Sequence, residues 1–302
     1  MHAEYQEEVF EVKSPEGRRI HCVHSIAAPD APIIVIAPQF EGTVRHGLLP
    51  MLYLVSNGFQ VVRFDYTNHR GNSEGEFDRF TASSARSDLA AVLGTVSKSL
   101  AFGNGLSLFA GSISSRIALR HLAEQPAGVD ALVSMLGVVD MGSTVRAATG
   151  QDIDLLIDDP DHFYGRQKAL NYMIDGDSWM RDLLQNGWHS LSGTRQDIDR
   201  MTTPTYLIVA EADDWVDIDD YSVAYGGNPG VLRHTYRIPG AGHELHKNPE
   251  ASKSALRAAT RALREFYGMS DQPLMEPTIA ELIAINGRER RRETRYRLEP
   301  AG

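Results

Sequence analysis

Three residues of this sequence, Ser112, Asp213 and His243, are of the types that together perform nucleophilic catalysis. A serine hydroxyl is a weak nucleophile until an imidazole accepts its proton, and the imidazole in turn needs a carboxylate that fixes its tautomer. Each of the three follows a different apolar, strand-like segment, so a parallel sheet would bring them to one edge. We therefore take them as the candidate nucleophile, acid and base.

Ser112 lies in the segment 108–117, which reads as a strand, a sharp turn and a helix. The usual signature of a nucleophile elbow is G-x-S-x-G, because the residues two positions either side of the serine must be small where strand and helix approach. Around Ser112 these positions hold Ala110 and Ser114, whereas around Ser114 or Ser115 they include arginine or isoleucine. Ser112 is the serine that fits, although this segment alone leaves open a serine that merely caps the helix.

The candidate partners of the serine come from two later loops. Asp213 follows the apolar segment 206–210, with Asp214 as the nearest alternative and Glu211 as a more distant one. His243 ends a glycine-rich turn after the last strand-like segment, and this position distinguishes it among the 11 histidines. The chain order serine, aspartate, histidine is that of the α/β-hydrolase fold.

An oxyanion hole needs backbone N–H groups preorganised around the developing negative charge. We expect one from Ile113, which follows the nucleophile, and one from Phe40, in the loop after the segment 33–37, with Gln39 as the alternative donor. The predicted substrate pocket is lined by Gln39, Trp179, Trp188 and Trp215. For the tryptophans, ordinary packing of a cap on a core is the alternative. We expect neither a metal nor a cofactor.

The elements that must position these residues alternate between strand and helix. The segment 33–37 is a continuous apolar run without alternation, which indicates a strand covered on both faces, and further strand-like segments occur at 60–65, 106–110, 131–135, 206–210 and 234–238. An opening hairpin is expected from 9–12 and 20–25, and helical periodicity appears at 48–55, 89–100, 117–122 and 251–266. This alternation predicts the α/β class, with a mostly parallel, doubly wound sheet.

One interval breaks the rhythm, because about 70 residues without a buried strand separate Met135 from Tyr206, far more than a crossover helix needs. The interval holds aromatic and methionine side chains beside an acidic run at 152–161. We predict a helical cap over the catalytic edge of the sheet; a decorated crossover is the alternative. The predicted organisation is a hydrolase-like core in 1–139 and 204–268, a cap in 140–203 and an arginine-rich helical tail in 269–302.

The composition narrows the setting. A net charge of −10 argues against nucleic acid or an anionic membrane as the main partner. The single cysteine, Cys22, allows no intrachain disulfide and favours a reducing compartment. Residues 1–10 lack the apolar core of a signal peptide, and there is no run of about 18 apolar residues that would span a membrane. We therefore expect a cytoplasmic, soluble protein.

Three motifs resemble one family: A-G-S-I-S at 110–114, A-D-D-W-V at 212–216 and G-A-G-H at 240–243. They are similar to the acyltransferases, or myristoyl-acyl-carrier-protein thioesterases, of the fatty-acid reductase system in luminous bacteria. That family also has A-x-S-x-S in place of G-x-S-x-G. Further similarity lies at 57–59, 62–65, 71–75, 186–188 and 279–292. The resemblance therefore covers nearly the whole chain.

The resemblance implies transfer of a fatty acyl group from a thioester of acyl carrier protein or coenzyme A to Ser112, and then to water or another acceptor. It implies Asp213 and His243 as the partners of that serine. The sequence departs from the family at 38–40, where Pro-Gln-Phe replaces a small, glycine-containing loop, and the insert is only loosely similar. Two other functions stay open: a carboxylesterase for small or natural-product esters, and a non-catalytic ligand-binding or scaffolding protein.

A cationic cluster ends the otherwise acidic chain. Its members are Arg288, Arg290, Arg291, Arg292, Arg295 and Arg297. Charge complementarity would let this cluster dock an acidic carrier protein or a partner subunit. Interleaved glutamates favour the alternative, a solvated helix with internal ion pairs.

Overall fold

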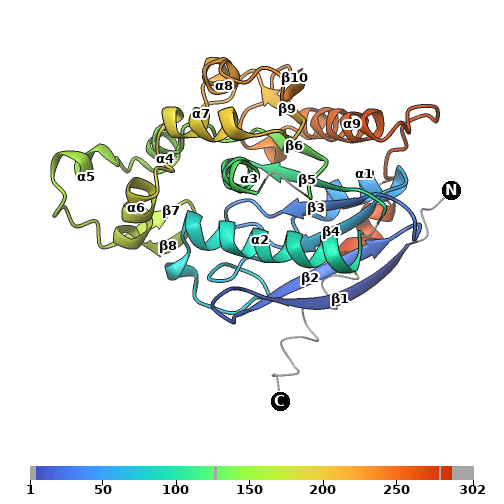
Figure 1. The fold of residues 1–302 in the computed structure, drawn as a ribbon, viewed down its shortest axis with the longest axis horizontal. Coiled ribbons are helices and arrows are strands. Elements are labelled where there is room, and N and C mark those ends of the chain that lie inside the picture. Colours follow the sequence, from blue (N-terminus) through green and yellow to red (C-terminus); the bar gives the residue numbers. More distant parts are fainter. Residues whose placement is uncertain (1–4, 102, 126–127, 279, 288–302) are drawn as a thin grey trace.

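The computed structural model describes residues 5–101, 103–125, 128–278 and 280–287. At the centre of this described part lies an eight-stranded sheet with the order β1-β2-β4-β3-β5-β6-β9-β10 (Figure 1). The strands are β1 (Gln6–Lys13), β2 (Arg19–Ile26), β3 (Ile33–Ala37), β4 (Gln60–Phe64), β5 (Leu106–Gly111), β6 (Ala131–Met135), β9 (Thr205–Ala210) and β10 (Leu232–Ile238). β2 pairs antiparallel with β1 and β4, and every neighbouring pair from β4 to β10 is parallel. The predicted doubly wound sheet is confirmed.

Helices cover both faces of the sheet, which explains why β3, β4, β5, β6 and β9 are buried along their whole length. Two separate hydrophobic clusters mark the two faces. The helices α1 (Leu48–Ser56) and α9 (Pro249–Phe266) contribute to one cluster. The helices α2 (Ala82–Ser99), α3 (Ile113–Glu124) and α8 (Ile218–Tyr225) contribute to the other. Two short 3-10 helices, η1 (Phe77–Arg79) and η2 (Leu245–Lys247), complete the core.

The order of the strands fixes where the site lies. From β3 the chain passes to β4 on one side and then returns to β5 on the other side. In such sheets ligands bind at the carboxyl ends of the strands, where the direction of winding reverses. The loop after β3 contains Gln39 and Phe40, and the turn after β5 contains Ser112, so both lie at this reversal.

The insert between β6 and β9 contains four helices and one hairpin in the described part of the chain. Its elements are α4 (Met141–Thr149), α5 (Asp154–Asp158), β7 (Arg166–Ala169), β8 (Tyr172–Asp175), α6 (Gly176–Gln185) and α7 (Leu191–Arg200). The antiparallel β7–β8 hairpin is an element that the prediction of a helical cap did not include. Its strands have four residues each, and its turn has Leu170 at φ 52° without a glycine, so the sequence carries no hairpin signature there.

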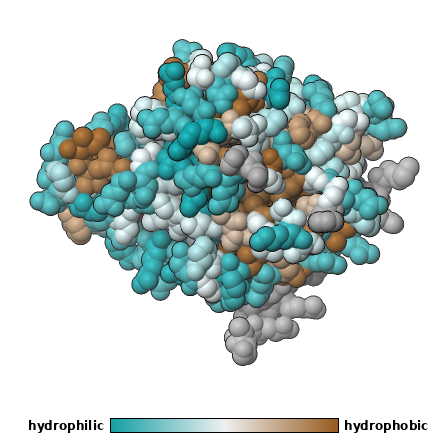
Figure 2. Space-filling model, in the orientation of Figure 1, coloured by the Kyte–Doolittle hydropathy of each residue, from teal (hydrophilic) through white to brown (hydrophobic). Residues whose placement is uncertain are grey.

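The far end of the insert projects from the core (Figure 1). Figure 2 shows an apolar patch over the region where Figure 1 places α5, and the exposed large apolar side chains of this region are Leu155, Ile157 and Phe163. At the other end of the chain, residues 280–287 are helical, and the arginine cluster at 288–297 lies outside the described residues. None of the described helices has the length and apolarity that a membrane crossing requires.

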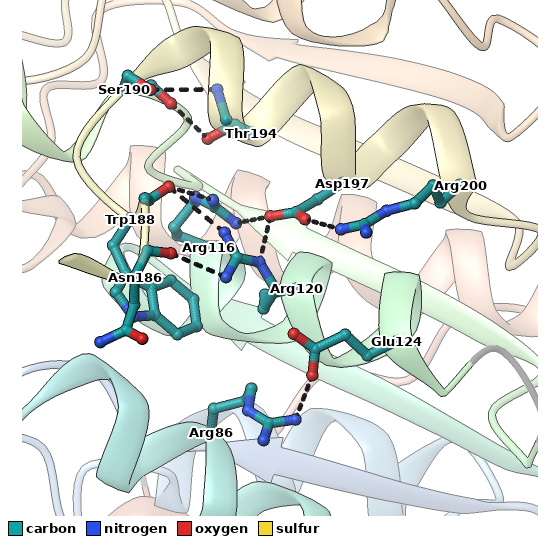
Figure 3. A network of polar contacts seen from close by, with 12 residues as sticks. Arg86, Arg116, Arg120, Glu124, Asn186, Trp188, Ser190, Thr194, Asp197 and Arg200 are labelled. Atoms are coloured by element: carbon teal, nitrogen blue, oxygen red, sulfur yellow. Dashed lines mark hydrogen bonds and ion pairs between the residues drawn. The ribbon is translucent and has the colours of Figure 1, made fainter. Parts of the chain in front are cut away.

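A buried ion-pair network fastens the insert to the helix that follows Ser112 (Figure 3). Arg116 Nη1 and Arg120 Nε of α3 both donate to Oδ2 of Asp197 on α7, each at 2.7 Å. The side chains of Arg116 and Asp197 are 0% and 1% exposed. Both arginines also donate to the carbonyl of Gly187, and their guanidinium groups lie over the ring of Trp188. The last part of the insert is thus held on α3, the helix that follows Ser112, by charge-assisted hydrogen bonds.

We predict that Asp197→Asn lowers the free energy of unfolding by about 3–5 kcal/mol, because it leaves Arg116 charged and buried without its carboxylate. Urea unfolding of both proteins measures this change. The matched control is Asp152→Asn, which breaks the exposed pair of Asp152 with Arg146 and should have a much smaller effect. Equal losses of unfolding free energy in the two variants would contradict a stabilising role for the buried Arg116–Asp197 pair.

Candidate active site

Ser112 occupies the sharp turn between β5 and α3, with φ 50° and ψ −129°. A non-glycine residue rarely adopts this region, and the strain is typical of a nucleophile elbow. Backbone hydrogen bonds hold the turn: Ser112 N–H donates to Met135 O, and its carbonyl accepts from Val138 N, both at 3.1 Å. The side chain makes no capping hydrogen bond to α3, so the helix-cap alternative is not what the structure contains.

The hydroxyl of Ser112 instead contacts His243, at 2.9 Å between Oγ and Nε2. On the other side of the ring, Nδ1 of His243 lies 2.9 Å from Oδ2 and 3.1 Å from Oδ1 of Asp213. Because a carboxylate only accepts, Nδ1 carries the proton and Nε2 is free to accept from the serine. This is the tautomer that general-base activation of Ser112 requires.

The loop after β9 aims Asp213, rather than its neighbours, at the histidine. Its Oδ1 accepts from the backbone N–H of Trp215 at 2.9 Å and of Val216 at 3.1 Å. The alternatives Asp214 and Glu211 are both exposed. A hydrogen bond from Ala212 N to Ala241 O at 2.8 Å joins the loop of Asp213 to the loop of His243.

His243 is closed off from water on one face. The ring of Trp215 stacks on it with the centroids 4.6 Å apart and the planes at 27°. The side chains of His243 and Asp213 are 5% and 4% exposed. A hydrogen bond between such groups is screened less than one at the surface, so the ring orientation is well defined.

A cavity of about 620 Å³ opens at Ser112, within the size range of small-molecule sites. The predicted oxyanion residues Phe40 and Ile113 line it, as do the predicted pocket residues Gln39, Trp179 and Trp215. Its apolar wall toward the insert is formed by Val138, Met141, Val145, Ala169, Leu170 and Trp179. The cavity therefore offers an apolar surface that begins at the serine.

Trp188 differs from its prediction, because the structure places it away from this cavity. Its ring is 1% exposed, and its Nε1 donates to Ser83 Oγ of α2 at 3.0 Å. Arg116 and Arg120 cover the ring at 5.2 and 4.6 Å from its centroid. The tryptophan joins the insert to two core helices and is not part of the cavity wall.

The two predicted oxyanion donors, the N–H groups of Ile113 and Phe40, are held in place by different contacts. The N–H of Ile113 belongs to the first turn of α3, where amides lack intrahelical partners and the helix dipole favours negative charge. Phe40 is held by its ring, which packs against Phe77, Phe80 and Trp179 at 5.6–6.3 Å. The loop before it is tied down by Ser114, whose hydroxyl donates to Pro38 O. The second serine of A-x-S-x-S thus has a structural partner that its spacing alone did not disclose.

His69 supports the same loop, a role for which its position in the sequence did not distinguish it from the other histidines. Its Nε2 accepts from the backbone N–H of Glu41 at 3.1 Å, and its side chain is buried among aromatic rings. Burial, assisted by the charge of Arg70, lowers the pKa of His69 to about 3. The ring therefore stays neutral and keeps its accepting lone pair at ordinary pH.

From the lowered pKa of His69 we predict how the free energy of unfolding changes at acidic pH. Between its ordinary pKa of about 6.5 and about 3, the unfolded chain binds a proton that the folded chain does not, so stability falls as the pH drops. His69→Gln should therefore reduce the pH slope of the unfolding free energy between about pH 6 and 4 by as much as ~1.4 kcal/mol per pH unit. Urea unfolding at several pH values measures the slope, with exposed His246→Gln as control. Parallel curves for wild type and His69→Gln would contradict a buried, neutral His69.

Similar solved structures define the class of the fold. Est1E from Butyrivibrio proteoclasticus, solved with ferulic acid bound, aligns with a TM-score of 0.69 at 17% identity over 86% of this chain and 99% of its own. An esterase of Pyrococcus furiosus aligns with a TM-score of 0.62 at 15% identity over 87% of this chain and 91% of its own. The chain has the α/β-hydrolase fold.

The sequence comparisons place the chain within that class. A profile of the acyl transferase family matches residues 16–297, and the chain belongs to this family. It is 28% identical to an acyl transferase of Photorhabdus luminescens over 285 residues, covering 91% of this chain and 90% of the relative. It is 29% identical to one of Photobacterium leiognathi over 267 residues, covering 85% and 84%. The resemblance to the acyltransferases of luminous bacteria is confirmed, and the chain is an enzyme of acyl transfer or hydrolysis.

Proposed function

We propose that this enzyme transfers a fatty acyl group from a thioester of acyl carrier protein or coenzyme A to Ser112, and from there to water or another acceptor. The single observation that carries the proposal is the hydrogen-bonded chain Ser112–His243–Asp213 at a cavity with an apolar wall. Membership of the acyl transferase family supports an acyl donor as substrate.

In the first half-reaction, His243 Nε2 accepts the proton of Ser112 Oγ while Oγ bonds to the thioester carbonyl carbon. The backbone N–H groups of Ile113 and Phe40 would stabilise the oxyanion of the tetrahedral intermediate. As the intermediate collapses, the carbon–sulfur bond breaks, and His243 gives its proton to the departing sulfur. The products are a free thiol and acyl-Ser112.

In the second half-reaction, water or an acceptor hydroxyl gives its proton to His243 Nε2 while its oxygen bonds to the acyl carbon. The bond from that carbon to Ser112 Oγ then breaks, and the proton returns to the serine. The carboxylate of Asp213 stabilises the imidazolium that forms in each half-reaction. At the end of the cycle Ser112 and His243 have regained their starting protonation states, and Asp213 is unchanged.

The apolar wall of the cavity is an argument for the proposal of a long acyl chain rather than a small acyl group as substrate. The insert contributes Met141, Val145 and Leu170 to the apolar wall of the cavity that Ser112 also lines. Each buried methylene contributes about 0.8 kcal/mol, which corresponds to roughly a fourfold change in an equilibrium or rate constant. We therefore expect kcat/KM to rise with the length of the chain until the cavity is full.

Substrate profiling tests the proposal. Acyl thioesters of increasing length are compared with short p-nitrophenyl esters on the wild-type enzyme, with Ser112→Ala as the blank. The proposal expects kcat/KM to rise by up to about fourfold per methylene and long thioesters to be preferred. Preference for short esters would instead favour a carboxylesterase, and no turnover of either class would favour a non-catalytic binding protein.

Two parts of the proposal concern the setting of the enzyme. We propose that it acts in the cytoplasm, an inference that rests on the single cysteine, Cys22. A protein partner at the arginine cluster of 288–297 stays a prediction, because those residues lie outside the described part of the chain.

A further inference from the structure

The turn that carries Phe40 is built around an unusual residue, Glu41. The N–H of Gly42 donates to the carbonyl of Gln39 at 2.8 Å, so Phe40 and Glu41 are the two central residues of a tight turn. Glu41 has φ 63°, and a positive φ at the third position of such a turn normally selects glycine or asparagine. A glutamate there is strained, so its side chain and its contacts have to offset the strain.

All polar groups of Glu41 have partners. Its N–H donates to His69 Nε2 at 3.1 Å, and its carbonyl accepts from Arg70 Nη1 at 3.4 Å. Its carboxylate accepts twice from Asn171: Oε1 from the backbone N–H at 2.7 Å and Oε2 from Nδ2 at 2.9 Å. The first two contacts hold the turn on the core, and the last two hold it on the insert.

Asn171 lies in the turn between β7 and β8, next to Leu170, which also has a positive φ of 52°. Ala169, Leu170 and Asn171 line the cavity that begins at Ser112. The same hairpin has a second attachment, since the guanidinium of Arg70 lies over the ring of Tyr172 at 4.6 Å. The hairpin therefore forms part of the cavity wall and also donates the hydrogen bonds that the Glu41 carboxylate accepts.

We infer that the Glu41–Asn171 contact is a positioning clasp that couples the cap hairpin to the oxyanion turn. Seating of an acyl chain against Ala169 and Leu170 holds the hairpin in place, and Glu41 passes that position on to the adjacent Phe40 N–H. Glu41 touches no reacting atom, so its effect is on the orientation of the donor. The inference rests on the proposed function of the site and adds to it a residue that favours long acyl groups.

Glu41→Gly separates this role from a structural one. Glycine adopts a positive φ without strain, so the variant should unfold at an unchanged or higher Tm. It also removes the carboxylate, so we expect the rate constant for acylation by a long-chain thioester to fall about 10- to 100-fold, with KM changing less than about twofold. The loss should be smaller for an acetyl thioester, which is too short to press on the hairpin.

Asn171→Ala breaks the clasp from the other side and should give the same split between kcat and KM. The double variant should be no slower than either single variant, because both remove one interaction. Lys168→Ala is the matched control: Lys168 is exposed on β7 of the same hairpin, and the change should leave the rate unaltered.

Acylation of Glu41→Gly at the wild-type rate would overturn the inference and leave the proposed function intact. The same holds for losses that only follow a lowered Tm, or for an equal loss in Lys168→Ala. A wild-type enzyme that no acyl thioester acylates would overturn the proposed function and, with it, the clasp.

Discussion

Replacing Ser112 with alanine should abolish covalent labelling by a fluorophosphonate and lower kcat by about a million-fold, while the protein stays folded. The reagent phosphonylates an activated serine oxygen, and Ser112 is the serine whose Oγ lies 2.9 Å from an imidazole nitrogen held by a carboxylate. Residues of such a unit act together, so the loss of the nucleophile removes nearly all of its contribution. In-gel fluorescence and intact mass measure the labelling, and circular dichroism checks the fold.

The matched control for this experiment is Ser115→Ala. Ser115 lies one helical turn on and is buried, but its hydroxyl donates to Ala110 O at 2.9 Å. It should keep full labelling. Labelling of Ser112→Ala at the wild-type level would show that another residue is the nucleophile.

Replacing Asp213 with asparagine should lower kcat by about ten-thousand-fold, with little change in the fold. An asparagine amide facing His243 Nδ1 donates, so the imidazole would have to carry its proton on Nε2, where it cannot accept from Ser112. The amide oxygen can still accept from Trp215 N and Val216 N, so the loop should keep its shape. Steady-state kinetics with the best acyl thioester measures the effect.

Asp214→Asn is the internal control, because Asp214 is the exposed neighbour of the proposed acid. We expect its kcat within about twofold of wild type, since its carboxylate does not contact His243. Equal losses in the two variants would mean that the histidine is oriented by a carboxylate other than Asp213.

The sequence was sufficient to predict the sheet, because the residue types of its buried strands differ clearly from those of the helices and loops. A fully buried strand such as β3 appears as an uninterrupted apolar run, and a helix such as α9 shows clear amphipathic periodicity. The elbow followed from local rules too: small residues flank Ser112 because strand and helix backbones approach there. Such features depend on neighbours in sequence and are accessible from residue types.

Features set by distant contacts were not accessible in this way. The β7–β8 hairpin consists of two short, partly exposed strands whose pairing depends on packing against the core. Strands of four residues are too short to show a hydrophobic period in the sequence. Trp188 shows the same limit: its type predicts burial, but only the structure shows that it lies beneath Arg116 and Arg120 rather than in the cavity. Glu41 and His69 are 28 residues apart, and nothing in either position suggests their hydrogen bond.

The most direct test of the proposed acyl-Ser112 intermediate is the detection, by intact mass, of an acyl group on Ser112. The wild-type enzyme is mixed with acyl thioesters of several lengths, quenched in acid before turnover is complete, and mapped by peptide mass. We predict a mass gain equal to the acyl group less one hydrogen, located on the peptide that contains Ser112, strongest for long chains and absent from Ser112→Ala. A persistent adduct on Ser112→Ala, or turnover of thioesters with no adduct at any quench time, would contradict it.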